Sequence, residues 1–313
     1  MDNKKRLIII DSNSVIHRAF HALPPLTTKK GELVNAVYGF LLVFLKVIQE
    51  FRPDYIAACF DFPAATFRHK KFKEYKAKRP PAPQELYQQI PRVKEVLRAF
   101  GIPIFEKEGF EADDIIGTIA RLVPKKQIIP EIETIILSGD RDILALVDTH
   151  TKVFILRKGV KDTVLYDENS VKAKYQGIKP EQLVDFKALT GDPSDNIPGV
   201  KGIGDKTAIE LLKQFGTVDN LFKELKEKSE RTKELKIKLK EKLLQSEEQV
   251  SLSQFLVKIE KHTPLEFNLK ECIFGKYSKE EVIKVLKNME FYSFVARIAE
   301  VKDPSIRKNL SFW

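Results

Sequence analysis

The chain has only two cysteines in 313 residues, Cys59 and Cys272, and they lie far apart without the spacing of paired ligands. A disulfide framework or a structural zinc site is therefore not expected. Cys59 lies in the apolar run 56–60, which indicates a buried thiol. The five histidines show no clustered ligand spacing, and we find no convincing Ser, Cys or His triad. The sequence does not predict chemistry that depends on zinc or on a side-chain nucleophile.

Long apolar segments are absent as well. No run approaches the length of about 18 apolar residues that a membrane-spanning helix needs. Early charges at the N-terminus are not followed by an apolar stretch of signal-peptide length. Internal repeats and low-complexity linkers are also missing. We therefore expect a soluble, intracellular protein that does not act at a membrane.

Basic residues outnumber acidic ones, with 54 Lys and Arg against 44 Asp and Glu, a net charge of +10 and a pI of about 9.3. Such an excess favours an anionic partner, of which nucleic acid is the commonest. A Lys-rich solvated surface, as in many heat-adapted proteins, is the alternative, and charge alone does not decide between them. The hydrophobic fraction of 43% is ordinary for a globular protein, and the length suits two modest domains.

In the first half, short apolar runs typical of buried strands alternate with helical patterns. The runs cover 7–10, 55–60, 134–137 and 153–156, and the helical patterns cover about 34–51, 84–100 and 112–122. This alternation predicts a mostly parallel sheet with helices on both faces.

After about Tyr175 the pattern becomes helical up to about 260, with a glycine-rich turn at 199–204. Residues 223–242 carry nine Lys or Arg and five Glu, which indicates an exposed, basic-leaning helix or helix pair. Pro264 marks a boundary. Beyond it we expect a short strand-like stretch, one helix near 278–289 and a polar tail.

Acidic residues follow three of the predicted strands. Asp11, Asp61 and Asp140 lie at or just beyond the C-terminal ends of these strands, the edge where open α/β sheets bind ligands. Three acids there would repel one another unless a cation neutralised them. Six further acids have close acidic neighbours: Glu111, Asp113, Asp114, Asp142, Asp192 and Asp195. A lone acid is more often a helix cap or a surface charge, but nine in this arrangement favour a site for Mg²⁺ or Mn²⁺.

One chemistry fits such a cluster in a basic chain. Two divalent ions about 3.5–4 Å apart can clamp a phosphodiester, one activating a water and the other stabilising the leaving oxygen. The sequence resembles the 5′-nuclease (flap endonuclease) superfamily, and within it most closely the 5′–3′ exonuclease domain of bacterial DNA polymerase I. The matching stretches are Leu7–Arg18, Ala36–Gly39, Phe60–Asp61, Phe67–His69, Tyr75–Lys76, Glu111–Asp114, Ser138–Asp142 and Ala188–Gly204.

The resemblance implies a PIN-like, resolvase-like nuclease domain followed by a helix-hairpin-helix (H3TH) domain. It assigns all nine acids to the metal site. Asp61, Glu111 and Asp113 would lie nearer the first ion, and the other group nearer the second: Asp142, Asp192 and Asp195.

A basic segment precedes the acidic stretch. Seven of the twelve residues 68–79 are Lys or Arg, with Phe72 and Tyr75 interleaved, so phosphate contacts and base stacking are expected. A plain solvated helix is the alternative. The resemblance implies a helical arch near 66–82 that gathers a single-stranded 5′ end. It assigns the scissile phosphate to Lys76 and Arg79, and nearby basic positions to Arg18 and Arg68.

The glycine turn 199–204 is not a P-loop, because Asp205 interrupts the required Gly-Lys-Thr order and no strand precedes it. It resembles the turn of a helix-hairpin-helix element, which holds duplex DNA through backbone groups, with a K⁺ ion in many relatives. The residues assigned to DNA are Gly199, Lys201, Gly202, Gly204 and Lys206. A purely structural turn before a helix at 205–215 is the alternative.

These observations predict a nuclease domain over 1–175, a duplex-binding domain over 176–262 and a C-terminal appendage over 263–313. The expected activity is Mg²⁺- or Mn²⁺-dependent cleavage of DNA with 5′ flaps, nicks or free 5′ ends, and of RNA primers. We expect a monomer in the bacterial cytoplasm, associated with the nucleoid, with a DNA polymerase as a candidate partner. Two other possibilities stay open: a non-catalytic junction binder on the same fold, and the excised nuclease part of a polymerase. A small single-domain ribonuclease fits poorly, since it would lack the glycine turn and the second domain.

Overall fold

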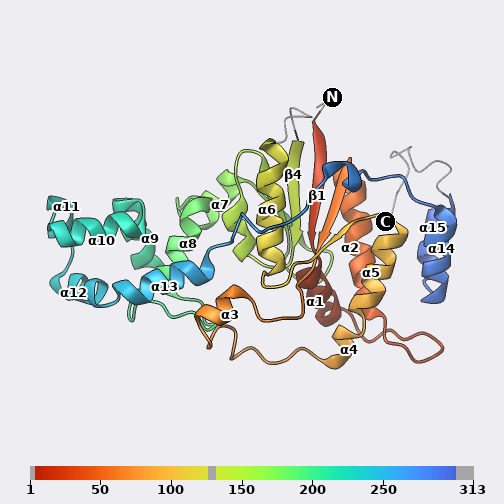
Figure 1. Ribbon diagram of the computed structural model, residues 1–313, viewed down its shortest axis with the longest axis horizontal. Helices are drawn as coiled ribbons and strands as arrows, with labels where there is room; N and C mark the ends of the chain where they lie inside the picture. The colour runs from red at the N-terminus through yellow and green to blue at the C-terminus, as the bar shows by residue number, and fades with distance from the viewer. Residues whose placement is uncertain (1–3, 126–131, 301–313) are drawn as a thin grey trace.

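The computed structural model describes residues 4–125 and 132–300 (Figure 1). A six-stranded sheet lies at its centre, in the order β3-β2-β1-β4-β5-β6. Strands β1 to β5 run parallel, whereas β6 runs antiparallel to β5. The strands are β1 (Lys5–Asp11), β2 (Tyr55–Cys59), β3 (Ile104–Phe105), β4 (Ile132–Ser138), β5 (Thr151–Leu156) and β6 (Thr163–Tyr166). The predicted mostly parallel α/β sheet is confirmed, although the short strands β3 and β6 were not predicted.

Both faces of the sheet are covered, as its continuous apolar strands require. Alternate residues of β1 point to opposite faces: Leu7 and Ile9 join one buried cluster, and Ile8 and Ile10 join the other. The first cluster includes the apolar face of α6 (Ala112–Lys125). The second includes the apolar faces of α1 (Ser12–Ala22), α2 (Asn35–Phe51) and α5 (Ile90–Ala99). Helix α1, directly after β1, was not predicted.

The second half is helical, as predicted, and reaches away from the sheet before returning to it (Figure 1). Its helices are α7 (Glu168–Lys174), α8 (Leu183–Thr190), α9 (Asp205–Phe215), α10 (Val218–Glu227), α11 (Glu230–Lys233), α12 (Ile237–Gln245) and α13 (Glu247–Val257). The expected single helix or helix pair over 223–242 is wrong, because three helices share that range. The chain leaves α10 at Lys228, whose backbone is left-handed with φ of 53°.

The C-terminal part differs from its prediction. Residues near 265 form no strand; the chain makes a short 3₁₀ turn (Leu269–Cys272) and one isolated bridge between Ile273 and Tyr55. Two helices follow, α14 (Lys279–Asn288) and α15 (Tyr292–Glu300), so α15 replaces the start of the expected polar tail. The rest of that tail, 301–313, lies outside the described residues. α15 forms because Phe294 can pack against Tyr38 of α2, with ring centroids 4.9 Å apart.

The core is continuous across the predicted boundary near residue 175, because one buried cluster joins Ile136 of β4 to Leu189 of α8 and Leu212 of α9. The three-part division of the chain therefore stays a prediction. Within the described ranges, no helix has the length and apolar character needed to cross a membrane.

Candidate active site

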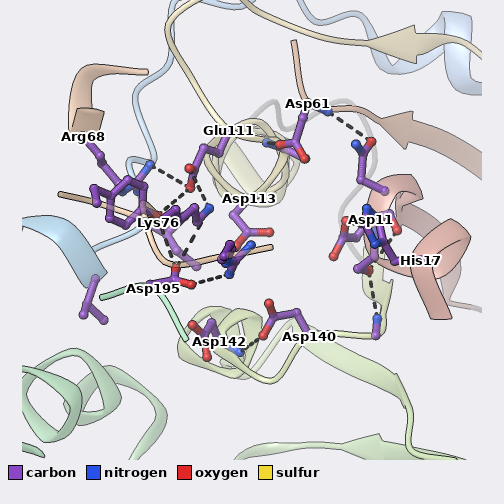
Figure 2. A pocket seen from close by; sticks show the side chains of 18 of the residues that line it. Asp11, His17, Asp61, Arg68, Lys76, Glu111, Asp113, Asp140, Asp142 and Asp195 are labelled. Carbon is purple, nitrogen blue, oxygen red and sulfur yellow. Dashed lines mark hydrogen bonds and ion pairs between the residues drawn. The ribbon is translucent and has the colours of Figure 1, made fainter. Parts of the chain in front are cut away.

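Seven of the nine predicted acids line one pocket of about 400 Å³ (Figure 2). Asp11 is the last residue of β1, and Asp61 and Asp140 follow β2 and β4 by two residues. These three strands are neighbours in the sheet, so their carboxyl ends meet at one edge. Four more acids reach the same pocket from outside the sheet: Glu111, Asp113, Asp142 and Asp195.

The strand-end acids are fixed by hydrogen bonds. The Ser138 hydroxyl donates to Asp11 at 2.6 Å, and the backbone N–H of Ser14 donates to the same carboxylate at 3.3 Å. Burial raises the pKa of Asp11 to about 6, because the charged form is poorly solvated. Asp61 accepts a 2.8 Å bond from the N–H of Ala112, so it caps the first turn of α6.

Glu111 and Asp113 come from the start of α6 and have opposite electrostatics. Desolvation, together with the carboxylates of Asp11 and Asp140, raises the pKa of Asp113. Desolvation also opposes ionisation of Glu111, but Lys76 and Arg68 outweigh it and lower its pKa. Glu111 is therefore stabilised as a carboxylate, whereas Asp113 needs further positive charge nearby before its ionised form is stabilised.

A second group of acids lies where the loop after α8 faces the 3₁₀ turn Asp142–Leu146. Oxygen atoms of Asp142, Asp192 and Asp195 lie within 4.8 Å of one another. Burial, with Asp140 nearby, raises the pKa of Asp142 to about 6. Asp192 does not line the pocket itself but joins the group through this contact.

Lys187 of α8 was missed by the sequence analysis. Its Nζ contacts Asp142 and lies 2.7 Å from Asp192. Burial opposes its charge, yet these two carboxylates raise the pKa of Lys187. The chain reverses at Gly191, where φ is 81°, and this reversal brings Asp192 back to a lysine five residues earlier. No local spacing signals such a pair, so only the fold reveals it.

The basic segment is mostly not helical, so the helical arch predicted over 66–82 is wrong in that respect. Helix α3 (Phe67–Lys71) ends after five residues, and Lys76 has a left-handed backbone with φ of 56°. Two basic side chains of the segment nevertheless contact acids of the pocket. The Lys76 ammonium lies 2.7 Å from Glu111, and the Arg79 guanidinium contacts Asp195.

Tyr75 does not present its ring for base stacking, which corrects the expected role of this residue. Only 4% of it is exposed, and it packs with Ile197 and Leu256. Its hydroxyl donates to Glu111 at 3.1 Å. Tyr75 thus anchors the basic segment above the pocket instead of meeting a base.

Arg68, which lines the pocket, and Asp114 form a buried ion pair. Arg68 is 2% exposed, and its two terminal nitrogens lie 2.8 and 2.7 Å from the Asp114 carboxylate. The remaining donors of Arg68 reach Glu111 and the backbone carbonyls of Leu256 and Lys258. All five guanidinium N–H groups are therefore engaged, which leaves none for a phosphate. Asp114 is fully buried, also accepts the N–H of Glu260 and is not among the residues that line the pocket.

Helix α1 forms one wall of the pocket. Arg18 lies there and donates to the carbonyl of Gly139 at 2.9 Å. Asn13, His17 and His21 line the same wall and were not predicted. Their spacing of four residues places them on one face of a helix, so the omission follows from missing α1 itself.

The glycine turn precedes α9, as predicted, but its glycines differ in role. A Cβ at Gly199 would lie 2.3 Å from the backbone of Thr190, so this glycine is required by packing. Gly202 has φ of 85°, which shapes the turn. Gly204 is the residue before the first turn of α9. Lys201, within the turn, and Lys206, in the first turn of α9, are both exposed.

The donor set fits hard divalent cations. Around the pocket, carboxylate oxygens converge from β1, from α6 and from the loop after α8. Oxygen ligands of this kind suit Mg²⁺ or Mn²⁺. Lys76, Arg79 and Lys187 each contact one of these carboxylates, as expected where negative charge is concentrated.

Comparison with known proteins gives the same picture for both halves of the chain. The model of the 5′-3′ exonuclease N-terminal resolvase-like domain matches residues 6–176, and that of the 5′-3′ exonuclease C-terminal SAM fold matches residues 178–280. DNA polymerase I of Bacillus caldotenax is 44% identical over 296 residues, which are 94% of this chain and 32% of that protein. The chain thus spans about a third of the length of this relative.

A relative of more similar size is the 5′-3′ exonuclease of Aquifex aeolicus, 42% identical over 219 residues, which are 70% of this chain and 73% of that protein. Among solved structures, T5 5′-exonuclease with bound divalent metal ions (zinc) has a TM-score of 0.66 at 20% identity, covering 95% of this chain and 100% of that one. The catalytic core of Rad2 in complex with DNA substrate has a TM-score of 0.59 at 17% identity, covering 94% and 91%. At these identities the structural matches establish the fold, whereas the domain models cover most of the chain. The chain belongs to the 5′-3′ exonuclease family.

Proposed function

We propose that this protein is a structure-specific, divalent-metal-dependent nuclease that hydrolyses phosphodiester bonds of DNA near free 5′ ends and at 5′ flaps. The observation that carries the proposal is one pocket in which acids from the sheet edge, from α6 and from the loop after α8 converge beneath a basic segment. Family membership supports the same reaction.

The acids fall into two groups that would each hold an ion. Asp61, Glu111 and Asp113 would hold one Mg²⁺ or Mn²⁺, and the group of Asp142, Asp192 and Asp195 the other. When bound, such a pair of ions supplies a water of lowered pKa and stabilises the leaving oxygen. Asp11 and Asp140 would complete the negative surface between the groups. Asp114 is left out of the ligand set, because its oxygens are engaged by Arg68.

The chain's own cations would bind and orient the reacting phosphate. Lys76 and Arg79 already lie against carboxylates of the two groups, so their donors reach the place where a phosphodiester would lie. Arg18 of α1 lines the same pocket. Fixed donors at this point stabilise the charge that builds up on the phosphoryl oxygens in the transition state.

The turn at 199–204 would hold the duplex beside the cleavage site through backbone N–H groups, Lys201 and Lys206, with a K⁺ ion at the turn. We further propose RNA primers as substrates, a monomeric state, a place at the bacterial nucleoid and a DNA polymerase as partner. The last proposal is supported by the polymerase relatives that carry this segment.

A cleavage assay tests the proposal directly. A duplex with a labelled 5′ flap would be incubated with the protein in Mg²⁺, in Mn²⁺ and in chelator, beside the Asp142→Ala variant. We expect products only with the divalent ions and the unmodified protein. Undiminished cleavage in chelator, or by Asp142→Ala, would overturn the mechanism.

A further inference from the structure

Two segments that are distant in the sequence are fastened together above the pocket. We call residues 72–79 the arch segment and residues 191–197 the acidic loop. The N–H of Lys76 donates to the carbonyl of Asp195 at 2.9 Å, and the side-chain amide of Asn196 donates to the carbonyl of Glu74 at 2.8 Å. Arg79 adds a 3.3 Å bond to the carbonyl of Ser194. The acidic loop therefore holds the backbone on both sides of Tyr75.

Both segments turn through a left-handed conformation at this contact. Lys76 and Asn196 each have φ of 56°. Asparagine tolerates this conformation, because its short polar side chain can bond locally, whereas a lysine adopts it only at a free-energy cost. The backbone at Lys76 must therefore be held by its surroundings.

The hold on Lys76 has an apolar part and a polar part. Tyr75 packs into a small apolar cluster with Ile197 and Leu256. This packing sets the distance between the arch segment and the pocket. Apolar packing is not directional, so it does not set the rotation of the following residue. The side-chain amide of Asn196 does set this rotation, because it donates a directional hydrogen bond to the carbonyl of Glu74, two residues before Lys76.

We propose that Asn196 is a positioning residue for catalysis: its side-chain amide fixes the arch segment so that the Lys76 ammonium points at the reacting phosphate. This inference rests on the function proposed above. The acidic loop would then have two roles. Asp192 and Asp195 supply carboxylates, and Asn196 orients the Lys76 ammonium. A phosphate bound between the carboxylates and the Lys76 ammonium would therefore find these groups held at a fixed distance from each other.

Asn196→Gly tests the proposal, because glycine keeps the left-handed backbone and removes only the amide. On a 5′-flap duplex with Mg²⁺, we expect single-turnover cleavage to slow about tenfold, as for loss of one oriented hydrogen bond. Binding of the same duplex in Ca²⁺ should stay within about twofold of the unmodified protein. Gln176→Gly is the matched control: Gln176 is exposed, has φ of 52° and lies outside the site, so its rate should not change.

A double-mutant cycle separates positioning from a general structural effect. In a Lys76→Ala background, Asn196→Gly should slow cleavage by less than about twofold, since the cation that it orients is gone. A full tenfold effect in that background, or an unchanged rate for Asn196→Gly alone, would overturn the inference. If Asn196→Gly folds poorly, Asn196→Asp, which also tolerates the backbone but has no N–H to donate, must show the same dependence on Lys76. Failure of the unmodified protein to cleave in Mg²⁺ would instead count against the proposed function.

Discussion

Individual charges in the pocket are arranged as opposed pairs. Lys76 contacts Glu111, Arg79 contacts Asp195, and Lys187 contacts Asp192. If a metal ion took the place of the lysine or arginine on a carboxylate, that side chain would be released to contact a phosphate oxygen. In the proposed mechanism, the same side chains would balance the acids before substrate arrives and bind the phosphate afterwards.

Lys76→Ala should slow single-turnover cleavage of a 5′ flap about 10²- to 10³-fold, because it removes one donor from the reacting phosphate. Duplex affinity should change less than about twofold, since the contacts proposed for the duplex lie at the turn 199–204. Lys78→Ala is the matched control, because it removes the same charge from an exposed position in the same segment. Equal rates for Lys76→Ala and the unmodified protein would show that Lys76 does not touch the phosphate.

Arg68→Ala should lower the free energy of unfolding by about 3–5 kcal/mol, because it leaves the fully buried Asp114 carboxylate without its partner. Urea unfolding at neutral pH measures this. Arg157→Ala breaks an exposed pair with Asp162 and should cost less than about 1 kcal/mol. Similar losses from the two variants would contradict the structural role given to Arg68.

At the scale of elements, the site is assembled from a rigid sheet edge and two segments laid across it. The carboxyl ends of β1, β2 and β4 are held by parallel pairing, so the acids they carry have little freedom. The arch segment and the acidic loop contain no helix or strand, and hydrogen bonds and apolar contacts join them to each other. The turn before α9 lies on a separate element, so the duplex binding proposed for it can be tested separately from bond breaking.

Replacing both Lys201 and Lys206 by Ala should weaken duplex binding. The slope of log K against log salt should become shallower by up to about two units, because each phosphate that is no longer neutralised reduces the slope by about 0.9. Cleavage at saturating protein should stay near that of the unmodified chain, since the acids are untouched. Titrations at several salt concentrations measure the slope.

The control for that experiment removes two exposed lysines, Lys284 and Lys287, from α14 at the opposite end of the molecule from α9 (Figure 1). Its slope should match that of the unmodified protein. An unchanged slope for the Lys201 and Lys206 variant would mean that the turn is purely structural.

Across the whole molecule, a net charge of +10 coexists with a pocket of concentrated negative charge. The general excess of positive charge attracts nucleic acid, whereas the local acids repel phosphate until cations neutralise them. Metal binding should therefore affect both activity and stability.

Removing divalent ions with chelator should abolish cleavage and lower the melting temperature. At Mg²⁺ concentrations about 100 times the dissociation constant, the folded state should gain about 2.7 kcal/mol. Thermal unfolding with and without Mg²⁺ measures this gain, and Asp142→Ala should reduce it. A melting temperature that does not respond to Mg²⁺ at any concentration would argue against a metal site in this pocket.

Much of the fold could be predicted from local patterns. The buried strands and the helix over Asp205–Phe215 follow from apolar periodicity, which depends only on neighbouring residues. Placement of acids after three strands predicted their convergence, because parallel strands share one carboxyl edge. The helix pair over 223–242, the helical arch and the strand near 265 were wrong, since each range offered several local structures that only distant contacts could choose between.

The sequence by itself determined the sheet, the acids at its edge and the basic character of the segment above them. The tertiary structure decided which charged groups line the pocket and which pair in the interior. It buried Arg68 against Asp114, turned Tyr75 inward and brought Asn196 to Glu74, 122 residues away. These pairings depend on which groups lose water on folding and which partner then meets them, and spacing along the chain does not carry that information.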